Sequence, residues 1–229
     1  MPRAAPYDRD TALEAAMLLF WRKGFHATSL KDLEAALRLK PGSIYAAFQS
    51  KENLCLLALE RYFETARSQF RARVAASPSP LQGLADNLRE FAKLPAEDCN
   101  HQPCMLVRTA LDTRTTVPAI AARAQSCLDG MLREITAAFA VAQAEGELPA
   151  DADPARLARR YQANLTALRL ELHEGTDPRA LRDLAEDMAC ETEALRHRSL
   201  PMSAPVPTAK KGADRSAPSE PGKLPGQNP

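Results

Sequence analysis

Apolar residues recur along most of the chain at the three- and four-residue spacing of helices, and runs that alternate polar with apolar residues are nearly absent. Apolar side chains with this spacing lie on one face of a helix, which packs that face against a neighbour. Aromatic residues make up only 5% of the chain, while alanine, leucine, arginine and glutamate, all good helix formers, dominate. We therefore predict an all-α fold.

Capping and turn residues bound four predicted helices in the first third of the chain. Gly24 stands where a C-cap glycine belongs, and the hydroxyl of Thr28 can cap the helix that follows. Pro41 suits the first turn of a third, very short helix, and Ser50 can cap a long fourth one. The four predicted ranges are 10–23, 28–37, 41–48 and 51–74.

A Ser-Pro-Ser-Pro run at 77–80 predicts a break, beyond which the helical pattern resumes. The last 29 residues, from 201 onward, hold seven prolines and no aromatic residue. Such a composition cannot support a packed core, so we predict a disordered tail at 201–229. Between the break and the tail we predict helices at 81–94, 104–115, 118–145, 154–173 and 178–197.

Charge is distributed unevenly, although the whole chain carries a formal charge of only +1. Residues 1–73 have 12 basic and 8 acidic side chains, a net charge of +4, whereas residues 74–200 have a net charge of −5. A basic end joined to an acidic remainder suits a protein that meets phosphate with one end only.

The segment 28–48 predicts two short helices around a tight turn, the arrangement of a helix-turn-helix. A small shared core can form from Leu30, Leu33, Leu37, Ile44 and Phe48. The opposite face carries Lys40, Gly42, Ser43, Tyr45 and Ala46. The major groove of B-DNA is about 12 Å wide and admits one helix, and small side chains let the helix backbone approach base edges. This face is therefore a candidate DNA-binding surface.

The stretch TSLKDLEAALRLKPGSIYAAFQSKENLCLLALERY, preceded by ALEAAMLLFWRKGFHA, resembles the DNA-binding domain of the TetR family. The likeness runs through the Gly24-Phe25 turn, a glycine-hydroxyl-aliphatic-tyrosine run at 42–45, and Ser50-Lys51-Glu52. The resemblance implies phosphate contacts from Thr28, Tyr45 and Lys51. It also implies that the major groove is lined by Lys40, Pro41, Gly42, Ser43 and Ala46. Pro41 and Ala46 depart from the residues that many members of the family carry.

The resemblance implies a DNA-binding domain at 1–55, followed at 56–200 by a helical ligand-binding and dimerisation domain. The family's last two long helices usually pair with those of a second copy as a four-helix bundle. Here they would be 154–173 and 178–197. Their apolar stripes could equally be buried within their own domain. The candidate dimer residues are Leu157, Tyr161, Leu165, Leu168, Leu181, Leu184 and Met188.

Apolar residues of the second domain could line an effector pocket, although the same residues would serve as ordinary core. These candidates are Phe91, Met105, Leu128, Met131 and Phe139. Arg108 and Arg169 lie in apolar helical stretches, where a buried cation would need a partner such as Asp112 or Glu171, or an anionic ligand. We expect both to be exposed on the surface instead.

Cysteine usage leaves one alternative open. Five cysteines are scattered through the chain, which is no disulfide framework, and we expect most of them to be small core residues. Cys99, His101 and Cys104, however, lie within six residues, a spacing that could hold a soft metal or oxidise to a disulfide. A cysteine-based redox or metal sensor is therefore an alternative interpretation.

No phosphate-binding glycine loop, nucleophile elbow or HExxH motif stands in the sequence, so we predict neither an enzyme nor a cofactor. No apolar run reaches membrane-spanning length, and we expect a cytoplasmic protein that binds no membrane. The expected function is a DNA-binding transcriptional repressor released by a small-molecule effector. Its expected partners are a double-stranded DNA operator and a second copy of the chain. A regulator that responds to no ligand is a further alternative.

Overall fold

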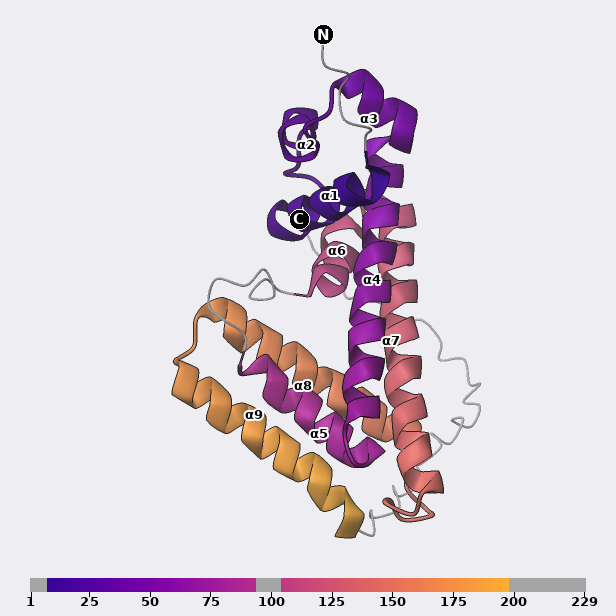
Figure 1. The fold of residues 1–229 in the computed structure, drawn as a ribbon, viewed down its shortest axis with the longest axis vertical. Coiled ribbons are helices and arrows are strands. Elements are labelled where there is room, and N and C mark those ends of the chain that lie inside the picture. The colour runs from indigo at the N-terminus through magenta and orange to yellow at the C-terminus, as the bar shows by residue number, and fades with distance from the viewer. Residues whose placement is uncertain (1–7, 94–103, 198–229) are drawn as a thin grey trace, which may run out of the picture.

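The computed structural model describes residues 8–93 and 104–197, and within these ranges every regular element is a helix. The predicted all-α fold is confirmed. Three helices gather at one end of the molecule, and two long helices connect that end to a second group of helices (Figure 1). The first group consists of α1 (Arg9–Lys23), α2 (Leu30–Leu37) and α3 (Pro41–Phe48).

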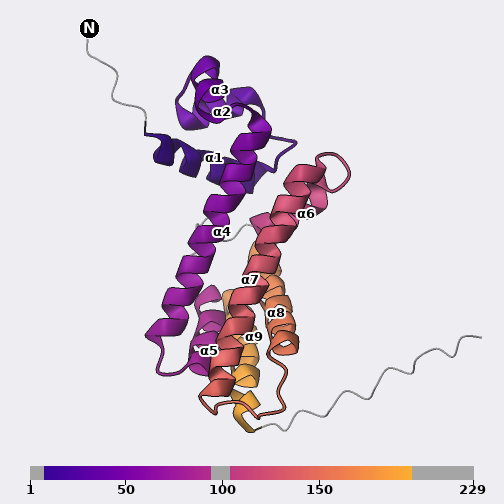
Figure 2. The same ribbon diagram turned by 90° about the vertical axis from the view of Figure 1, so that its right-hand side faces the viewer.

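The two longest helices run side by side along the molecule (Figures 1 and 2). They are α4 (Lys51–Ala76), with 26 residues, and α7 (Pro118–Ala144), with 27. At 1.5 Å per residue each is about 40 Å long. The domain boundary predicted at residue 55 lies inside α4, which continues without a break from one group of helices to the other.

The remaining helices surround the lower parts of α4 and α7, except for α6, which lies beneath α1 (Figure 1). α8 and α9 are consecutive antiparallel helices, and α9 packs along α5. All of them begin and end within a few residues of the predicted ranges. Their bounds are α5 (Pro80–Phe91), α6 (Met105–Thr113), α8 (Pro154–Glu174), α9 (Pro178–Glu193) and a 3-10 turn (Ala194–His197).

Local capping explains most boundaries, with one correction. Ser50 caps α4 through the amide of Asn53, and Gly24 ends α1 with a positive φ, as predicted. The predicted cap of α2 is wrong. Ser29, not Thr28, accepts the hydrogen bond from the amide of Asp32, whose carboxylate in turn accepts from Ser29. This reciprocal capping box satisfies two of the otherwise unpaired amides at the start of α2.

Two hydrophobic cores hold the molecule together. The first joins α1 to α4 with α6 and the first part of α7, so that Ile44 and Phe48 belong to the same cluster as Leu106 and Ile120. The second fills the space between the lower part of α7 and the helices α5, α8 and α9. The DNA-binding end predicted from the sequence is thus packed directly on α6, a helix of the second predicted domain.

The apolar stripes of α8 and α9 face this second core. All seven candidate dimer residues either belong to that core or pack against it. Leu157, Tyr161, Leu168 and Leu181 are less than 9% exposed, which leaves them no surface for a second copy. Those four side chains therefore do not form the dimer interface, whereas Leu165, Leu184 and Met188 are only partly buried and their place in a dimer interface stays a prediction.

The predicted tail at 201–229 lies outside the described residues. In the part of the chain that the structure covers, no helix is long and apolar enough to cross a membrane.

Candidate nucleic-acid interface

One face of α3 is buried in the first core, and the opposite face is exposed. Ile44 and Phe48 are buried at 2% and 1% exposure, and they fix the helix to the first core. On the opposite face the side chains predicted to meet DNA are exposed, among them Tyr45 at 49%. A helix of eight residues is too short to be stable alone, so this packing is what presents its outer face. The exposed residues are Lys40, Gly42, Ser43, Tyr45 and Ala46, with Pro41 partly buried.

The first turn of α3 has unoccupied space around it. A Cβ atom added at Gly42 would meet no atom within 4 Å. No side chain caps α3, whereas Ser29 and Ser50 cap the helices before and after it. The start of α3 is therefore the place where the backbone of this domain lies most open to a ligand.

Two predicted phosphate contacts differ in their surroundings. Lys51 begins α4, and its Nζ lies 4.4 Å from the centre of the Phe25 ring, a cation–π contact. Partial burial lowers the pKa of Lys51.

Thr28 is fully buried, and its hydroxyl donates to the carbonyl of Gly24 at 2.7 Å. We therefore withdraw Thr28 from the candidate contacts, and the exposed neighbour Ser29 takes its place. The Ser29-x-x-Asp32 capping spacing was the signal in the sequence for this assignment.

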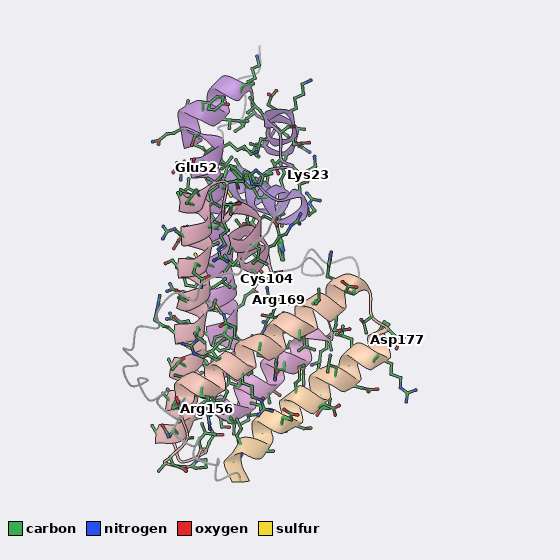
Figure 3. All side chains as sticks on the ribbon, turned by 180° about the vertical axis from the view of Figure 1, so that it is seen from behind. Lys23, Glu52, Cys104, Arg156, Arg169 and Asp177 are labelled. Carbon is green, nitrogen blue, oxygen red and sulfur yellow. The ribbon has the colours of Figure 1, made fainter. Side chains whose placement is uncertain are left out.

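Arg108 ties α6 to the end of α1. Its guanidinium donates to the carbonyls of Trp21, Arg22 and Lys23, each at 3.2 Å. Figure 3 places Lys23 at this end of α1. A cation at a helix C-terminus is favourable because the last carbonyls there have no partner within the helix. Its Nε also lies 3.5 Å from Oδ2 of Asp112, so Arg108, expected to be exposed on the surface, is 32% exposed and has partners in both α1 and α6.

A second contact joins the same two regions. Nε2 of His26, in the turn after α1, lies 2.8 Å from Oγ1 of Thr116, in the turn after α6. The helix-turn-helix end is therefore fastened to α6 and its following turn by polar contacts as well as by the shared core.

Two adjoining cavities lie below this junction, one of about 60 Å³ and one of about 70 Å³. The first is enclosed by α4, α6, α7 and α8, and the second by α4, α5, α7 and α8. Both are lined by Ala66, Met131, Leu165 and Arg169. Of the predicted pocket residues, Leu128, Met131 and Phe91 line these cavities. Met105 and Phe139 line neither and are core residues at 1% exposure.

Arg169 lies on the cavity wall, contrary to the expectation of surface exposure. Its Nη1 donates to the hydroxyl of Tyr62 at 2.6 Å, and its guanidinium carbon lies 5.0 Å from the centre of the Phe91 ring. Cys104 lies beside it between α6 and α8 (Figure 3). Burial raises the pKa of Tyr62, which keeps its hydroxyl neutral.

The cysteines fall into different environments. Cys55 and Cys127 are buried, as predicted for core residues, and burial raises the pKa of their thiols to about 12 and about 11. Cys190 is exposed, and Cys104 is partly buried at the cavity. Two members of the predicted sensor cluster, Cys99 and His101, lie outside the described residues. Among the residues that are described, no group of three potential ligands could hold a metal ion.

A short, exposed helix supported by a second one, at the basic end of an all-helical body, defines a helix-turn-helix regulator. Comparison with known proteins gives the family. The family model described as bacterial regulatory proteins, tetR family, matches residues 12–58. The model described as the tetracyclin repressor-like C-terminal domain matches residues 80–188. The chain belongs to the TetR family and is a DNA-binding transcriptional regulator.

Relatives match over most of their length. The HTH-type transcriptional repressor ComR of Escherichia coli (strain K12) is 28% identical over 184 residues, which cover 80% of this chain and 88% of ComR. A structure of a cysteine mutant of the TetR family regulator CifR, complexed with 26bp double-strand operator DNA, is 31% identical. It has a TM-score of 0.69 and covers 83% of this chain and 98% of that chain. A TetR family regulator from Cytophaga hutchinsonii is 23% identical, with a TM-score of 0.70 over 84% of this chain and 97% of that chain, and shares the fold.

Proposed function

We propose that the chain is a homodimeric repressor that binds an operator through α3 and leaves it when a small molecule occupies the cavities below. One observation carries this proposal. α3 exposes small and hydroxyl-bearing residues on one side while Ile44 and Phe48 anchor the other side in the core. A helix held in this way fits a major groove.

The proposed contacts divide into two kinds. Gly42, Ser43 and Ala46 face the base edges, with Lys40 and Pro41 at the start of the helix. Tyr45, Lys51 and Ser29 would contact phosphates, since Tyr45 and Ser29 are exposed and Lys51 lies partly exposed at the start of α4. ComR is named a repressor, and CifR is complexed with operator DNA, which supports the same activity here.

The dimer would use the outer face of α8. Ala163, Ala167 and Leu170 are exposed and follow one another at helical spacing on that face, and Leu170 is 52% exposed. An exposed leucine beside small residues gives two copies of α8 a flat apolar surface to share. A two-fold dimer places two copies of α3 at a fixed separation, which sets the spacing of the operator half-sites.

The effect of the ligand on DNA binding would be transmitted through α6. Leu106 and Val107 line one cavity, and Arg108, next in sequence, donates to the end of α1. A ligand that displaces α6 therefore moves the helix-turn-helix with it. A ligand acts in this way only if it binds the two arrangements with different affinity.

The operator is first identified by selection of bound fragments from genomic DNA, and its affinity is then measured by fluorescence anisotropy. We expect log affinity to fall with log salt concentration by about 0.9 per phosphate neutralised. Tyr45→Phe and Lys51→Ala should each weaken binding roughly tenfold, because each removes a charge-assisted hydrogen bond. Lys93→Ala, at an exposed lysine of α5's end, is the control and should bind as the unaltered protein does.

The weakening should be equal on operator and unrelated DNA, since phosphates carry no sequence information. Full affinity in both Tyr45→Phe and Lys51→Ala, with normal circular dichroism, would remove these contacts. Failure of the unaltered protein to select any DNA fragment would contradict operator binding as a whole.

A further inference from the structure

Arg169 lies on a cavity wall, and none of the described carboxylates pairs with it. Its described contacts are the hydroxyl of Tyr62, the ring of Phe91 and the sulfur of Cys104, none of which is a carboxylate. A guanidinium has five donors, of which the Tyr62 hydroxyl accepts only one.

The other charged side chains around the cavities do not offset this charge. Glu90 is the one carboxylate among the described lining residues, and it pairs with Lys93 at 2.7 Å. Arg73 adds a second cation, whose Nη1 donates to the amide oxygen of Asn87 at 3.1 Å. A partly buried cation is costly unless an anion or several acceptors complete its surroundings. The described lining of the cavities therefore has an excess of positive charge, from Arg73 on α4 and Arg169 on α8.

The rest of the lining combines apolar side chains with the uncharged polar residues Gln69, Asn87, Gln162 and Thr166, and the space is small. Leu128, Met131 and Leu165 provide much of the surface opposite the guanidinium. A cavity needs a volume of roughly 10–15 Å³ to hold one water-sized group. The two cavities, of about 60 and 70 Å³, therefore hold on the order of ten heavy atoms together. That is the size of a short fatty acid or a one-ring aromatic acid.

We propose that the effector is a small monocarboxylate with an apolar body, anchored by Arg169. The planar guanidinium donates two parallel hydrogen bonds to the carboxylate, and the Tyr62 hydroxyl, which accepts from Arg169, donates its own proton to the same group. The apolar body of the acid lies against Met131 and Leu165. This inference rests on the proposed function, in which an occupied cavity releases DNA.

The chain contains its own reporter for the test. Its one tryptophan, Trp21, stacks edge-to-face on Tyr62 with ring centres 4.9 Å apart. An acid bound at Tyr62 should therefore change the fluorescence of Trp21. The probes are benzoate and hexanoate, each compared at equal ionic strength with its neutral amide, benzamide or hexanamide. The full-length protein is titrated up to about 10 mM, which covers the weak affinity of a single anchoring contact.

We expect saturable binding of at least one acid and roughly tenfold or weaker binding of its amide, because the amide lacks the charge. Arg169→Gln should lower the affinity for the acid by a similar factor. Arg169→Lys should retain part of it, since the lysine keeps the charge but not the planar donor pair. Arg159→Gln is the matched control, an exposed arginine of the same helix, and should bind the acid normally.

Thermal unfolding provides a second measurement that does not depend on fluorescence. The acid should raise the unfolding temperature of the unaltered protein and of Arg159→Gln but not that of Arg169→Gln. Equal binding of acid and amide, no saturable binding of either acid, or undiminished binding in a folded Arg169→Gln variant would overturn the inference. Operator binding is measured on the same preparations. A neutral compound that releases DNA from both the unaltered protein and Arg169→Gln would overturn the anionic effector while supporting the proposed function.

Discussion

Gly42 is the second residue of α3, and the protein leaves the space beside its Cα empty. A side chain there meets no neighbour, and this exposed position lies outside both cores. Because exposed substitutions change stability by only about 0.5 kcal/mol, Gly42→Val should leave the free energy of unfolding nearly unchanged. Its operator affinity should nevertheless fall at least tenfold, by about 1.4 kcal/mol, because the isopropyl group would separate the helix from the base edges.

Urea unfolding and anisotropy titration on the same sample check the two halves of this prediction. Ala72→Val is the matched control, since Ala72 is exposed on α4 far from α3 along the same chain. It should preserve both stability and affinity. Equal affinity of Gly42→Val and the unaltered protein would mean that the start of α3 does not lie against the DNA.

At the scale of elements, α6 is the link between the cavities and the helix-turn-helix. It contributes Leu106 and Val107 to the cavity wall and Arg108 to the carbonyls that end α1. The shared core reinforces this contact, because Leu106 is buried in the same cluster as Phe20 and Leu33. The family's DNA-binding domain is therefore not an independent unit in this chain but is continuous with α6 through packing.

Arg108→Gln should separate ligand binding from DNA release. The side chain is 32% exposed, so its loss should lower the free energy of unfolding by only about 1 kcal/mol. The effector should still bind, as measured by calorimetry, whereas its effect on operator affinity should shrink at least fivefold, since coupling energies are typically about 1–3 kcal/mol.

Arg114→Gln provides the control for this prediction, because Arg114 is an exposed residue directly after α6. It should show the full effect of the ligand on DNA affinity. Unaltered coupling in a folded Arg108→Gln variant would indicate that the signal passes along α4 instead, whose residues Tyr62 and Ala66 also line the cavity.

At the scale of the whole molecule, the second core leaves one large apolar residue of α8 uncovered. Leu170 is 52% exposed and lies next to Ala163 and Ala167 on the outer face of the helix. Leu170→Glu should dissociate the dimer in sedimentation velocity, because a carboxylate on a two-fold axis faces its own copy. Operator affinity should also fall when the dimer dissociates, since a monomer contacts only one half-site.

Leu111→Glu is the control for that prediction, because Leu111 is 68% exposed on α6 and should tolerate the charge. Both variants should keep the helical content of the unaltered protein. A Leu170→Glu variant that stays dimeric would assign the dimer contact to another face.

The sequence alone determined the helices and their order. Gly24, Pro41 and Ser50 act on backbone groups within a few residues, so they define helix ends wherever the helix is placed in space. Helical periodicity likewise identified Ile44 and Phe48 as the anchored face of α3. The motif from residue 42 to residue 52 then gave the family, because its order and spacing are themselves sequence properties.

Only the tertiary structure decided what each helix face meets. Periodicity identifies the apolar stripe of α8 but not whether this chain or a second copy covers it, and the chain itself does. Periodicity also does not distinguish Thr28 from Ser29 as a cap, although the acidic residue three positions after Ser29 does, and the turn directs the Thr28 hydroxyl to the carbonyl of Gly24. Arg108 and Arg169 meet partners 85 or more residues away, at the end of α1 and on α4. Such contacts depend on packing between distant segments, which no local pattern encodes.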